Sequence, residues 1–267
     1  MTREKRRDDD VLSPGQEAPP LPELASWVEL EGCFNFRDLG GYATRDGRTL
    51  RTGRVYRADG LQELSPRDLD HLCGERALGH VIDLRSSVEV EAHGRGGIAA
   101  RATIHPVPLF EQTRESAAGE MARNMPGNMG DLYFLMLTAA SGPIARVVGL
   151  LAEVDAPAVF HCAAGKDRTG LISALLLSLL DVPDETIVAD YAVSRRNLDR
   201  INARLDASET YQRLMNDLPD GAYDADPEAM RHFLARVRAE HGSFEAFAEG
   251  AGIDAALRGR LRERLLA

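Results

Sequence analysis

The feature that most constrains this chain is residues 161–170, which read His-Cys-Ala-Ala-Gly-Lys-Asp-Arg-Thr-Gly. An apolar run at 157–160, typical of a short strand, precedes this stretch, and a longer apolar run at 171–180, typical of a buried helix, follows it. A strand, a tight loop and a helix N-terminus in this order direct successive backbone N–H groups and the positive end of the helix dipole into one small concavity. The stretch therefore predicts a loop that binds a tetrahedral oxyanion such as phosphate.

Cys162 lies at the base of this expected loop. The helix-terminal N–H groups and the cations Lys166 and Arg168 favour its thiolate, which is the nucleophilic form of cysteine. Arg168 follows six residues after Cys162, so its planar guanidinium reaches back across the loop and binds two phosphoryl oxygens. The residues expected to bind phosphate are Ala163, Ala164, Gly165, Lys166, Asp167 and Arg168. The alternative, an inert buried thiol beside a helix cap, gives no reason for the glycine and the charged residues of the loop.

The remaining residues of the stretch suit proton transfer and support. Thr169 is expected to donate its hydroxyl toward the thiolate, and His161 to orient the loop rather than to transfer protons. The departing oxygen of a phosphate ester needs a proton. Asp167 is the first candidate for this general acid, because a phosphate bound beside it favours its protonated form.

Two other charged pairs stand beside a predicted strand end or turn. Asp83 ends a short apolar strand, where α/β folds place functional groups, and is the second candidate for the general acid. A helix cap or a surface ion pair with Arg85 explains Asp83 equally well. Arg37 and Asp38 precede a glycine pair, and local reasoning alone favours a surface pair for them over a functional role.

Apolar periodicity predicts an α/β fold. Strands are expected within 50–57, 80–85, 102–107 and 157–160, and helices within 131–140, 143–154, 171–180, 183–205 and 226–240. Further helices are expected to begin at Ser65 and Ser243. Because strands alternate with helices, we expect a mostly parallel central sheet. The polar, glycine- and methionine-rich segment 111–130 is expected to be a mobile loop next to the site.

Size and charge limit the functions open to the chain. Its 267 residues, 44% of them hydrophobic, suit one domain over 23–267. The leader at 1–22 lacks apolar periodicity and is expected to be disordered, as a solvated tail rather than a docking arm. A formal net charge of −10 argues against general binding to nucleic acid or anionic membranes. Cys33, Cys73 and Cys162 are widely spaced and suggest neither a disulfide framework nor a zinc site.

No stretch of the sequence predicts insertion into a membrane. No apolar run reaches the length of about 18 residues that spans a bilayer. No apolar signal region follows the N-terminal cations. We therefore expect no integral membrane association, and a cytoplasmic location or export without a Sec-type signal peptide. The sequence leaves the oligomeric state open.

Three segments carry a resemblance to a known family. They are residues 35–41, which read Asn-Phe-Arg-Asp-Leu-Gly-Gly, residues 83–85, which read Asp-Leu-Arg, and residues 161–170. Together with Asp-Tyr-Ala-Val-Ser at 190–194, they make the chain, over about 30–267, similar to the atypical bacterial tyrosine phosphatases related to mycobacterial protein tyrosine phosphatase B.

This resemblance implies a phosphatase-type α/β fold, with helices on both faces of the sheet and a helical lid within 185–240. It also implies a phosphoprotein or phosphoinositide substrate: phosphotyrosine, and in several related enzymes phosphoserine, phosphothreonine or phosphoinositides. Arg37 and Asp38 become supporting residues. Lys166 matches a lysine of phosphoinositide phosphatases, but Ala163 stands where some of them carry another cation, which weakens the prediction of lipid specificity.

The expected reaction is two-step covalent catalysis without a metal or cofactor. The Cys162 thiolate takes the phosphoryl group, and water then hydrolyses the phosphocysteine. A nucleotide-binding loop is one alternative, since the Gly-Lys pair resembles part of a Walker motif. That motif needs Ser or Thr where Asp167 stands and glycine where Phe160 stands. A catalytically inactive phosphate-binding adaptor is disfavoured by the presence of Cys162 and Arg168.

Overall fold

The structure is a computed structural model that describes residues 27–111, 126–215 and 221–267. The leader predicted at 1–22 lies outside these residues, as does most of the segment 111–130, which was predicted to be a mobile loop. Both expectations therefore stay predictions.

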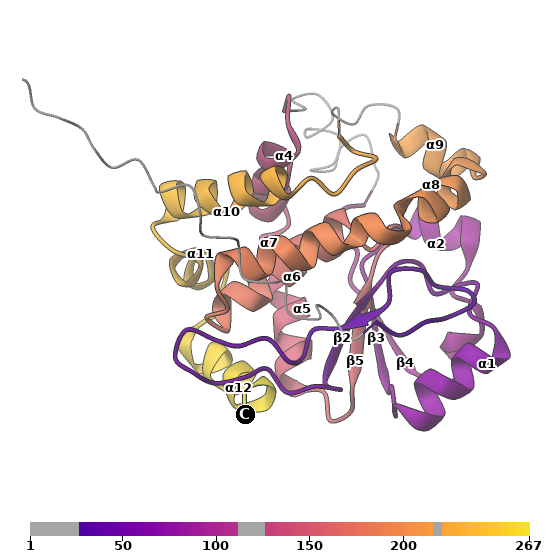
Figure 1. The fold of residues 1–267 in the computed structure, drawn as a ribbon, viewed down its shortest axis with the longest axis horizontal. Helices are drawn as coiled ribbons and strands as arrows, with labels where there is room; N and C mark the ends of the chain where they lie inside the picture. The colour runs from indigo at the N-terminus through magenta and orange to yellow at the C-terminus, as the bar shows by residue number, and fades with distance from the viewer. Residues whose placement is uncertain (1–26, 112–125, 216–220) are drawn as a thin grey trace, which may run out of the picture.

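Within the described residues, five strands form one sheet in the order β1-β2-β5-β3-β4, with helices on both faces (Figure 1). The strands are β1 (Arg37–Asp38), β2 (Val55–Ala58), β3 (His80–Asp83), β4 (Thr103–Pro106) and β5 (Ala158–His161). Neighbouring strands run parallel, except that β1 pairs antiparallel with β2 at one edge. The mostly parallel α/β sheet predicted from the sequence is confirmed.

Helices and short helical turns connect and cover the strands. They are α1 (Pro66–Leu69), η1 (Asp70–Glu75), α2 (Ser87–His93), η2 (Gly96–Ala100), α4 (Met129–Ala139), α5 (Ser141–Glu153), α6 (Asp167–Leu179), α7 (Asp184–Val193), η3 (Ser194–Asn197), α8 (Leu198–Asp206), α9 (Glu209–Met215), α10 (Pro227–His241), α11 (Phe244–Gly250) and α12 (Ala255–Leu265). Side-chain hydrogen bonds from Ser65, Asp226 and Ser243 cap α1, α10 and α11, as the sequence predicted.

The central strand β5 alternates its side chains between two hydrophobic clusters. Val159 packs in the smaller cluster, with apolar residues of α1 and η1, whereas Ala158 and Phe160 pack in the larger one, with α5 and α6. Because β5 lies between β2 and β3, the chain leaves the middle of the sheet just before Cys162. The carboxyl edge of a parallel sheet is where α/β folds place their sites.

The helix after the loop is buried, as its apolar sequence predicted. Every residue of α6 from Thr169 to Leu179 is buried. The helix begins at Asp167, so residues 162–166 stand at its N-terminus, where unpaired N–H groups and the helix dipole favour an anion.

The single long helix predicted at 183–205 is wrong. The chain instead forms α7, a 3₁₀ turn and α8. The turn begins at Ser194, whose buried hydroxyl accepts hydrogen bonds from Arg37 Nη2 at 3.2 Å and Asn35 Nδ2 at 3.3 Å. These long-range contacts hold the turn in place, and helical periodicity gives no sign of them.

Residues 185–240, where a helical lid was predicted, form α7, α8, α9 and most of α10, apart from 216–220, which the structure does not describe; the lid itself stays a prediction. α7 packs on α6, and α10 packs on α4 and α7. α9 packs on α2, at the end of the molecule where the sheet carries its loops (Figure 1). The movement that a lid requires stays a prediction.

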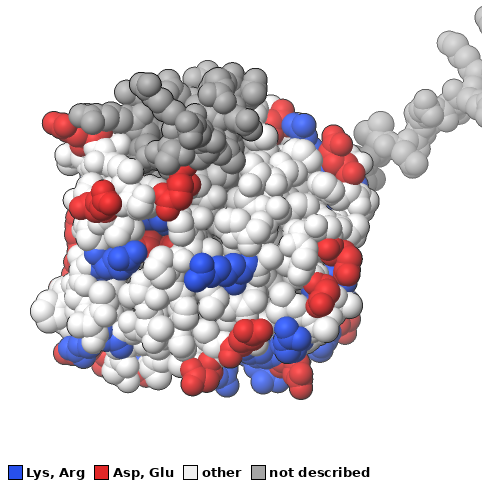
Figure 2. Space-filling model, turned by 180° about the vertical axis from the view of Figure 1, so that it is seen from behind, with Lys and Arg blue, Asp and Glu red and all other residues white. Residues whose placement is uncertain are grey.

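Charges on the face seen in Figure 2 are mixed. Lys and Arg side chains lie among Asp and Glu side chains, and no broad basic surface stands out among the described residues of this face. Within the described chain, no single helix is long and apolar enough to cross a membrane. The pair α4 and α5, bent by 78°, meets that test only when both helices are taken together.

Candidate active site

The loop of residues 162–166 joins β5 to α6 and packs closely on the end of β2. Gly165 has a φ of 66°, and a Cβ at this position would lie 2.6 Å from the carbonyl carbon of Ala58. Only glycine allows this approach. Among the described residues, none accepts a hydrogen bond from the backbone N–H groups of 163–166, so these groups are available to an anion.

The carbonyl groups of the loop are held on its other side. Asn35 Nδ2 donates to Ala164 O at 3.3 Å and to Gly165 O at 3.1 Å. Arg57 Nη2 donates to Gly165 O at 2.8 Å. Because the N–H and C=O of a planar trans peptide point in opposite directions, these bonds turn the N–H groups away from Asn35 and Arg57.

A buried ion cluster fixes Arg57, one of the residues that bind the loop carbonyls. Asp190 accepts hydrogen bonds from Arg37 Nε at 3.0 Å, Arg57 Nη1 at 2.5 Å and Tyr42 Oη at 3.1 Å. Burial alone would raise the pKa of Asp190, but the charges of Arg37 and Arg57 hold it below its usual range. The Asp190 carboxylate is therefore charged and fixes both guanidinium groups.

The surface pair that local reasoning favoured for Arg37 and Asp38 is wrong. Both side chains are buried, and Arg37 pairs with Asp190, which lies 153 positions away. Asp38 accepts hydrogen bonds from Gly40 N at 2.7 Å and Gly53 N at 2.5 Å, so it fixes the turn after β1. Burial, which outweighs these two bonds, raises the pKa of Asp38.

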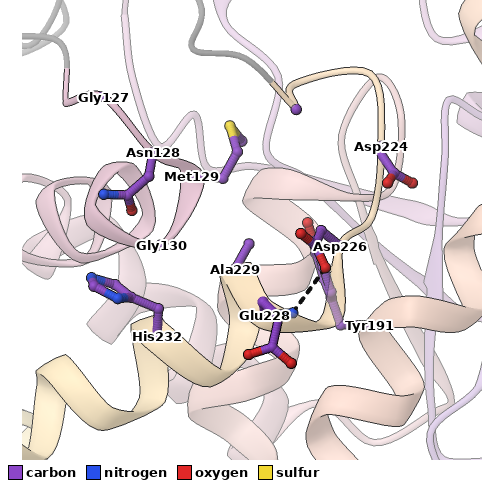
Figure 3. Close-up of a pocket in the computed structure, with 11 residues that line it drawn as sticks. Gly127, Asn128, Met129, Gly130, Tyr191, Asp224, Asp226, Glu228, Ala229 and His232 are labelled. Carbon is purple, nitrogen blue, oxygen red and sulfur yellow. Dashed lines mark hydrogen bonds between the residues drawn. The ribbon is translucent and has the colours of Figure 1, made fainter.

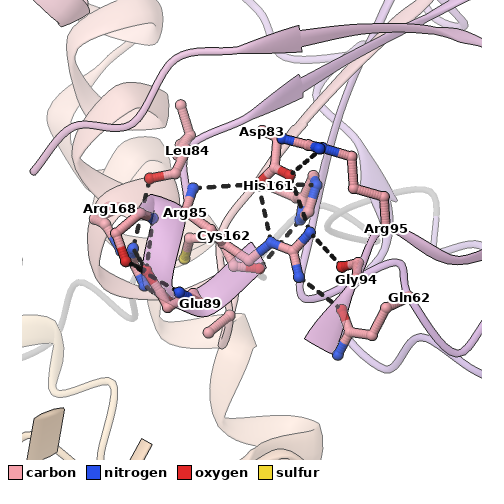
Figure 4. Close-up of polar contacts among 12 residues, drawn as sticks. Gln62, Asp83, Leu84, Arg85, Glu89, Gly94, Arg95, His161, Cys162 and Arg168 are labelled. Atoms are coloured by element: carbon pink, nitrogen blue, oxygen red, sulfur yellow. Dashed lines mark hydrogen bonds and ion pairs between the residues drawn. The ribbon is translucent and has the colours of Figure 1, made fainter. Parts of the chain in front are cut away.

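Cys162 lies on the floor of the loop and is 2% exposed (Figure 4). The Thr169 hydroxyl lies 3.2 Å from Cys162 Sγ, which is the contact expected from the sequence. A hydrogen bond donated to sulfur favours the thiolate over the thiol. The thiol therefore has a hydrogen-bond donor from the first turn of α6.

Glu89, a residue not predicted from the sequence, holds Arg168 (Figure 4). Arg168 Nη1 lies 2.6 Å from Glu89 Oε2, and Nη2 lies 2.7 Å from Oε1. Burial alone would lower the pKa of Arg168, but the Glu89 carboxylate raises it, so the guanidinium stays charged. Five N–H donors belong to a guanidinium, and the Nε–H together with the remaining Nη hydrogens can bind phosphoryl oxygens.

A capping box at the start of α2 fixes Glu89 in turn. The Glu89 carboxylate accepts hydrogen bonds from Ser86 N at 2.8 Å and Ser86 Oγ at 3.0 Å, and Glu89 N donates to Ser86 Oγ at 3.3 Å. The pattern Ser-x-x-Glu, placed just after the strand that ends at Asp83, is the sequence signal that could have located Glu89.

Asp83 belongs to a buried charged cluster (Figure 4). Arg85 Nε and Nη2 each lie 2.9 Å from its carboxylate oxygens, and Arg95 Nε lies 3.4 Å away. The ion pair with Arg85 is thus present but buried, not on the surface, and Ser86 rather than Asp83 caps α2. Burial alone would raise the pKa of Asp83, but His161 and Arg85 hold it below its usual range.

His161 links this cluster to the loop. Its Nε2 lies 3.6 Å from Asp83 Oδ1, and its Nδ1 lies 3.2 Å from Cys162 O. Burial lowers the pKa of His161, against the opposing effect of Asp83, so the imidazole is neutral at pH 7. These contacts suit a residue that orients the loop.

Asp167 opens α6 with a side chain that is 28% exposed. Tyr133 Oη donates to Asp167 Oδ1 at 2.7 Å and lies 2.6 Å from Tyr191 Oη. Burial raises the pKa of Tyr133 well above its ordinary value, so its hydroxyl remains a donor. Within the described part of the chain, hydrogen bonds and ion pairs reach Oδ1 alone, and Oδ2 makes none.

The Lys166 ammonium binds backbone carbonyls. It is buried and donates to Ala222 O and, at 2.7 Å, to Asp224 O, and it lies 3.3 Å from Asp167 Oδ1. The side chain thus ties the loop to the segment 221–225 before α10, and the backbone N–H of Lys166 belongs to the set that an anion can use.

A pocket of about 280 Å³ lies next to this segment, between α4 and α10 (Figure 3). Tyr191, Asp224 and His232 are among its lining residues, whereas Cys162 and Arg168 are not. The pocket is therefore separate from the phosphate loop. Among the described residues, no group of three or more His, Cys, Asp or Glu side chains is placed to hold a metal ion.

A family model and several named proteins are similar to this chain. A family model described as the tyrosine phosphatase family matches residues 28–267. The triple specificity protein phosphatase PtpB of Mycobacterium tuberculosis is 30% identical over 281 aligned positions, which cover 89% of this chain and 98% of PtpB. A protein of Cupriavidus necator, whose name includes the words tyrosine-protein phosphatase, is 33% identical and covers 72% of this chain and 73% of its own length. A tyrosine-protein phosphatase of Nostoc commune is 30% identical over 50% of this chain and 48% of its own.

Proposed function

Because the chain belongs to the tyrosine phosphatase family, we propose that it hydrolyses phosphotyrosine through a phosphocysteine intermediate on Cys162. The observation that carries this proposal is the loop itself, which combines a buried thiol, backbone N–H groups of 163–166 that no described residue binds, and the Arg168 guanidinium fixed by Glu89. Phosphoserine, phosphothreonine and phosphoinositides are further substrates in this proposal.

In the first step, the Cys162 thiolate attacks phosphorus in line, and the bond between phosphorus and the ester oxygen breaks. Arg168 and the N–H groups of 163–166 bind the equatorial oxygens and stabilise the charge of the transition state. Asp167 gives its proton to the departing oxygen, so the tyrosine side chain leaves as a neutral phenol.

In the second step, water attacks the phosphocysteine and the bond between phosphorus and sulfur breaks. The Asp167 carboxylate takes a proton from this water, so the acid of the first step is restored. The Thr169 hydroxyl, 3.2 Å from Cys162 Sγ, stabilises the thiolate as it departs. Inorganic phosphate then leaves the loop.

Asp83 has a positioning role in this mechanism. Its carboxylate is held charged by Arg85, which does not suit a proton donor. Its contact with His161, 3.6 Å from Nε2, supports the residue that precedes the nucleophile. Asp167, whose Oδ1 is held while no described residue binds Oδ2, suits the general acid better.

Trapping of the intermediate tests the proposal. A pulse of radiolabelled aryl phosphate, followed by acid quench, should leave label on the wild-type protein and none on Cys162→Ala. Cys73→Ala, which removes a half-buried thiol elsewhere, is the control and should label like the wild type. Turnover by the wild type without trapped label, or label retained by Cys162→Ala, would overturn the intermediate.

The substrate class needs a separate comparison. The Lys166 ammonium is bound to the carbonyls of Ala222 and Asp224, so it is not the free cation that would select an inositol phosphate. We therefore expect a higher kcat/KM on a phosphotyrosine peptide than on short-chain phosphoinositides. A higher value on the phosphoinositides would reverse the order of substrates.

A further inference from the structure

Tyr211 on α9 carries a hydroxyl that no described residue binds. The residue is 5% exposed, and its Oη is buried without a hydrogen-bond partner in the described part of the chain. A buried polar atom without a partner is costly, and native proteins seldom keep one without a use. The two-step reaction described above gives this hydroxyl no role.

One face of α2 connects Tyr211 to Arg168. Glu89 and His93 stand four positions apart on this helix, so their side chains share a face. Glu89 binds Arg168, and the His93 ring stacks on the Tyr211 ring with centroids 4.7 Å apart and planes 8° from parallel. The helix therefore presents the guanidinium and the phenol to the same side.

Contacts within the protein fix the ring of Tyr211. Ser208 Oγ lies 2.9 Å from His93 Nε2, and it accepts a hydrogen bond from Tyr211 N at 3.4 Å. Ser208 thus joins the start of α9 to the stacked imidazole. A donor held in one orientation loses little entropy when it binds a ligand.

The charges that act on Tyr211 are those of the active site. Burial raises its pKa to about 12, Glu89 and Cys162 act in the same direction, and Arg85 and Arg168 act against it. The hydroxyl is therefore protonated at neutral pH and can donate. The stack on His93, one turn of α2 after Glu89, places the Tyr211 ring on the side of α2 that holds Arg168.

We propose that Tyr211 is a further phosphate-binding residue, whose hydroxyl donates a hydrogen bond to a non-bridging oxygen of the phosphoryl group in the Cys162 loop. This inference rests on the proposed phosphatase function and adds a ligand from α9 to those of the loop. A charged phosphoryl oxygen supplies the hydrogen-bond acceptor that the described residues do not offer to Tyr211 Oη. Because the contact is to the phosphoryl group, it serves every monoester substrate alike.

Tyr211→Phe removes the hydroxyl and keeps the stacked ring. We expect the Kd for inorganic phosphate, measured by calorimetry on the full chain, to rise by about tenfold or more, the scale of a hydrogen bond to a charged group. The kcat/KM on an aryl phosphate should fall by a similar factor. The Tm should stay the same or rise, because an unpaired buried hydroxyl is lost. Tyr223→Phe, which removes the hydroxyl of a 51% exposed residue, is the control and should leave all three values unchanged.

His93→Ala tests the positioning by α2. It should weaken phosphate binding in the wild type and have no further effect in Tyr211→Phe, since both changes act through one hydroxyl. If the wild type binds phosphate and Tyr211→Phe binds it within a factor of about two, the assignment of Tyr211 is wrong while the proposed function stands. If the wild type neither binds phosphate nor traps label, the proposed function fails, and the role of Tyr211 fails with it.

Discussion

Glu89 holds both Nη atoms of Arg168, at 2.6 Å and 2.7 Å, and the same carboxylate closes the capping box that starts α2. The position of the guanidinium at the phosphate loop is therefore set by where a different helix begins. In the proposed mechanism Arg168 binds the equatorial oxygens of the phosphoryl group, so small shifts of α2 would reach the transition state through this ion pair.

Glu89→Gln keeps the size of the side chain and removes its charge. We expect kcat/KM to fall about 10- to 100-fold, because a misplaced guanidinium stabilises the transition state less. The loss should be the same for aryl phosphates with good and poor leaving groups, since Arg168 does not transfer protons. Glu91→Gln, on the exposed side of α2, is the control. An unchanged kcat/KM in Glu89→Gln would show that the loop alone positions Arg168.

Asp167→Asn separates proton donation from positioning. Turnover of an aryl phosphate with a poor leaving group should fall about 100-fold or more, because that oxygen cannot leave without a proton. An aryl phosphate with a good leaving group should lose far less. The measurement is kcat/KM on both substrates, and equal losses on the two would remove the assignment of Asp167 as general acid.

Asp190→Asn removes the counter-charge of two buried guanidinium groups. We expect the free energy of unfolding at pH 7 to fall by about 3–5 kcal/mol, because Arg37 and Arg57 would be left buried without their carboxylate. Urea unfolding measures the change. Asp199→Asn, on the exposed side of α8, should stay within about 0.5 kcal/mol of the wild type. A similarly small effect of Asp190→Asn would mean that the cluster does not stabilise the fold.

The Asp190 carboxylate also makes the free energy of unfolding depend on pH. Burial opposes the charge of Asp190, but Arg37 and Arg57 depress its pKa in the folded protein. Its contribution to stability is therefore complete above the unfolded value of about 3.9 and is lost as the pH falls through the folded pKa. The difference in unfolding free energy between the wild type and Asp190→Asn should be constant from pH 7 to pH 5 and narrow below about pH 4. If this difference in unfolding free energy narrowed already above pH 5, the result would contradict a depressed pKa of Asp190.

Local sequence was sufficient where local contacts decide the structure. The strand, loop and helix around Cys162 follow from apolar runs and a glycine that lie next to one another, and Thr169 lies only seven positions after Cys162. The capping box of Ser86 and Glu89 was equally readable, but its link to Arg168, 79 positions away, depends on how α2 meets the loop.

Contacts between residues far apart in the sequence determine the features that were not predicted. Local reasoning predicted that Arg37 lies on the surface. The side chain is buried because it pairs with Asp190, which lies 153 positions further along the chain. The turn at Ser194 interrupts a good helical pattern because Arg37 and Asn35 bind its hydroxyl. Lys166 lies in the phosphate loop, yet its ammonium binds carbonyls that follow it by more than fifty positions. Periodicity and propensity carry no information about such partners.

Gly165→Ala tests whether the loop needs its close approach to β2. The φ of 66° is unfavourable for alanine, and the new Cβ would lie 2.6 Å from backbone atoms of Ala58, which cannot turn aside. We expect a cost of about 1–3 kcal/mol in unfolding free energy and a loss of about 100-fold in kcat/KM, because the N–H groups of the loop would move.

Gly149→Ala is the matched control for this change. Gly149 lies within α5, a Cβ there would meet no atom within 4 Å, and alanine is the better helix former by about 0.5–1 kcal/mol. This variant should be as active as the wild type and slightly more stable in urea. If Gly165→Ala were as active as Gly149→Ala, the N–H groups of the loop would not be the donors that bind the phosphoryl oxygens. Arg168 would then be the main residue that binds them.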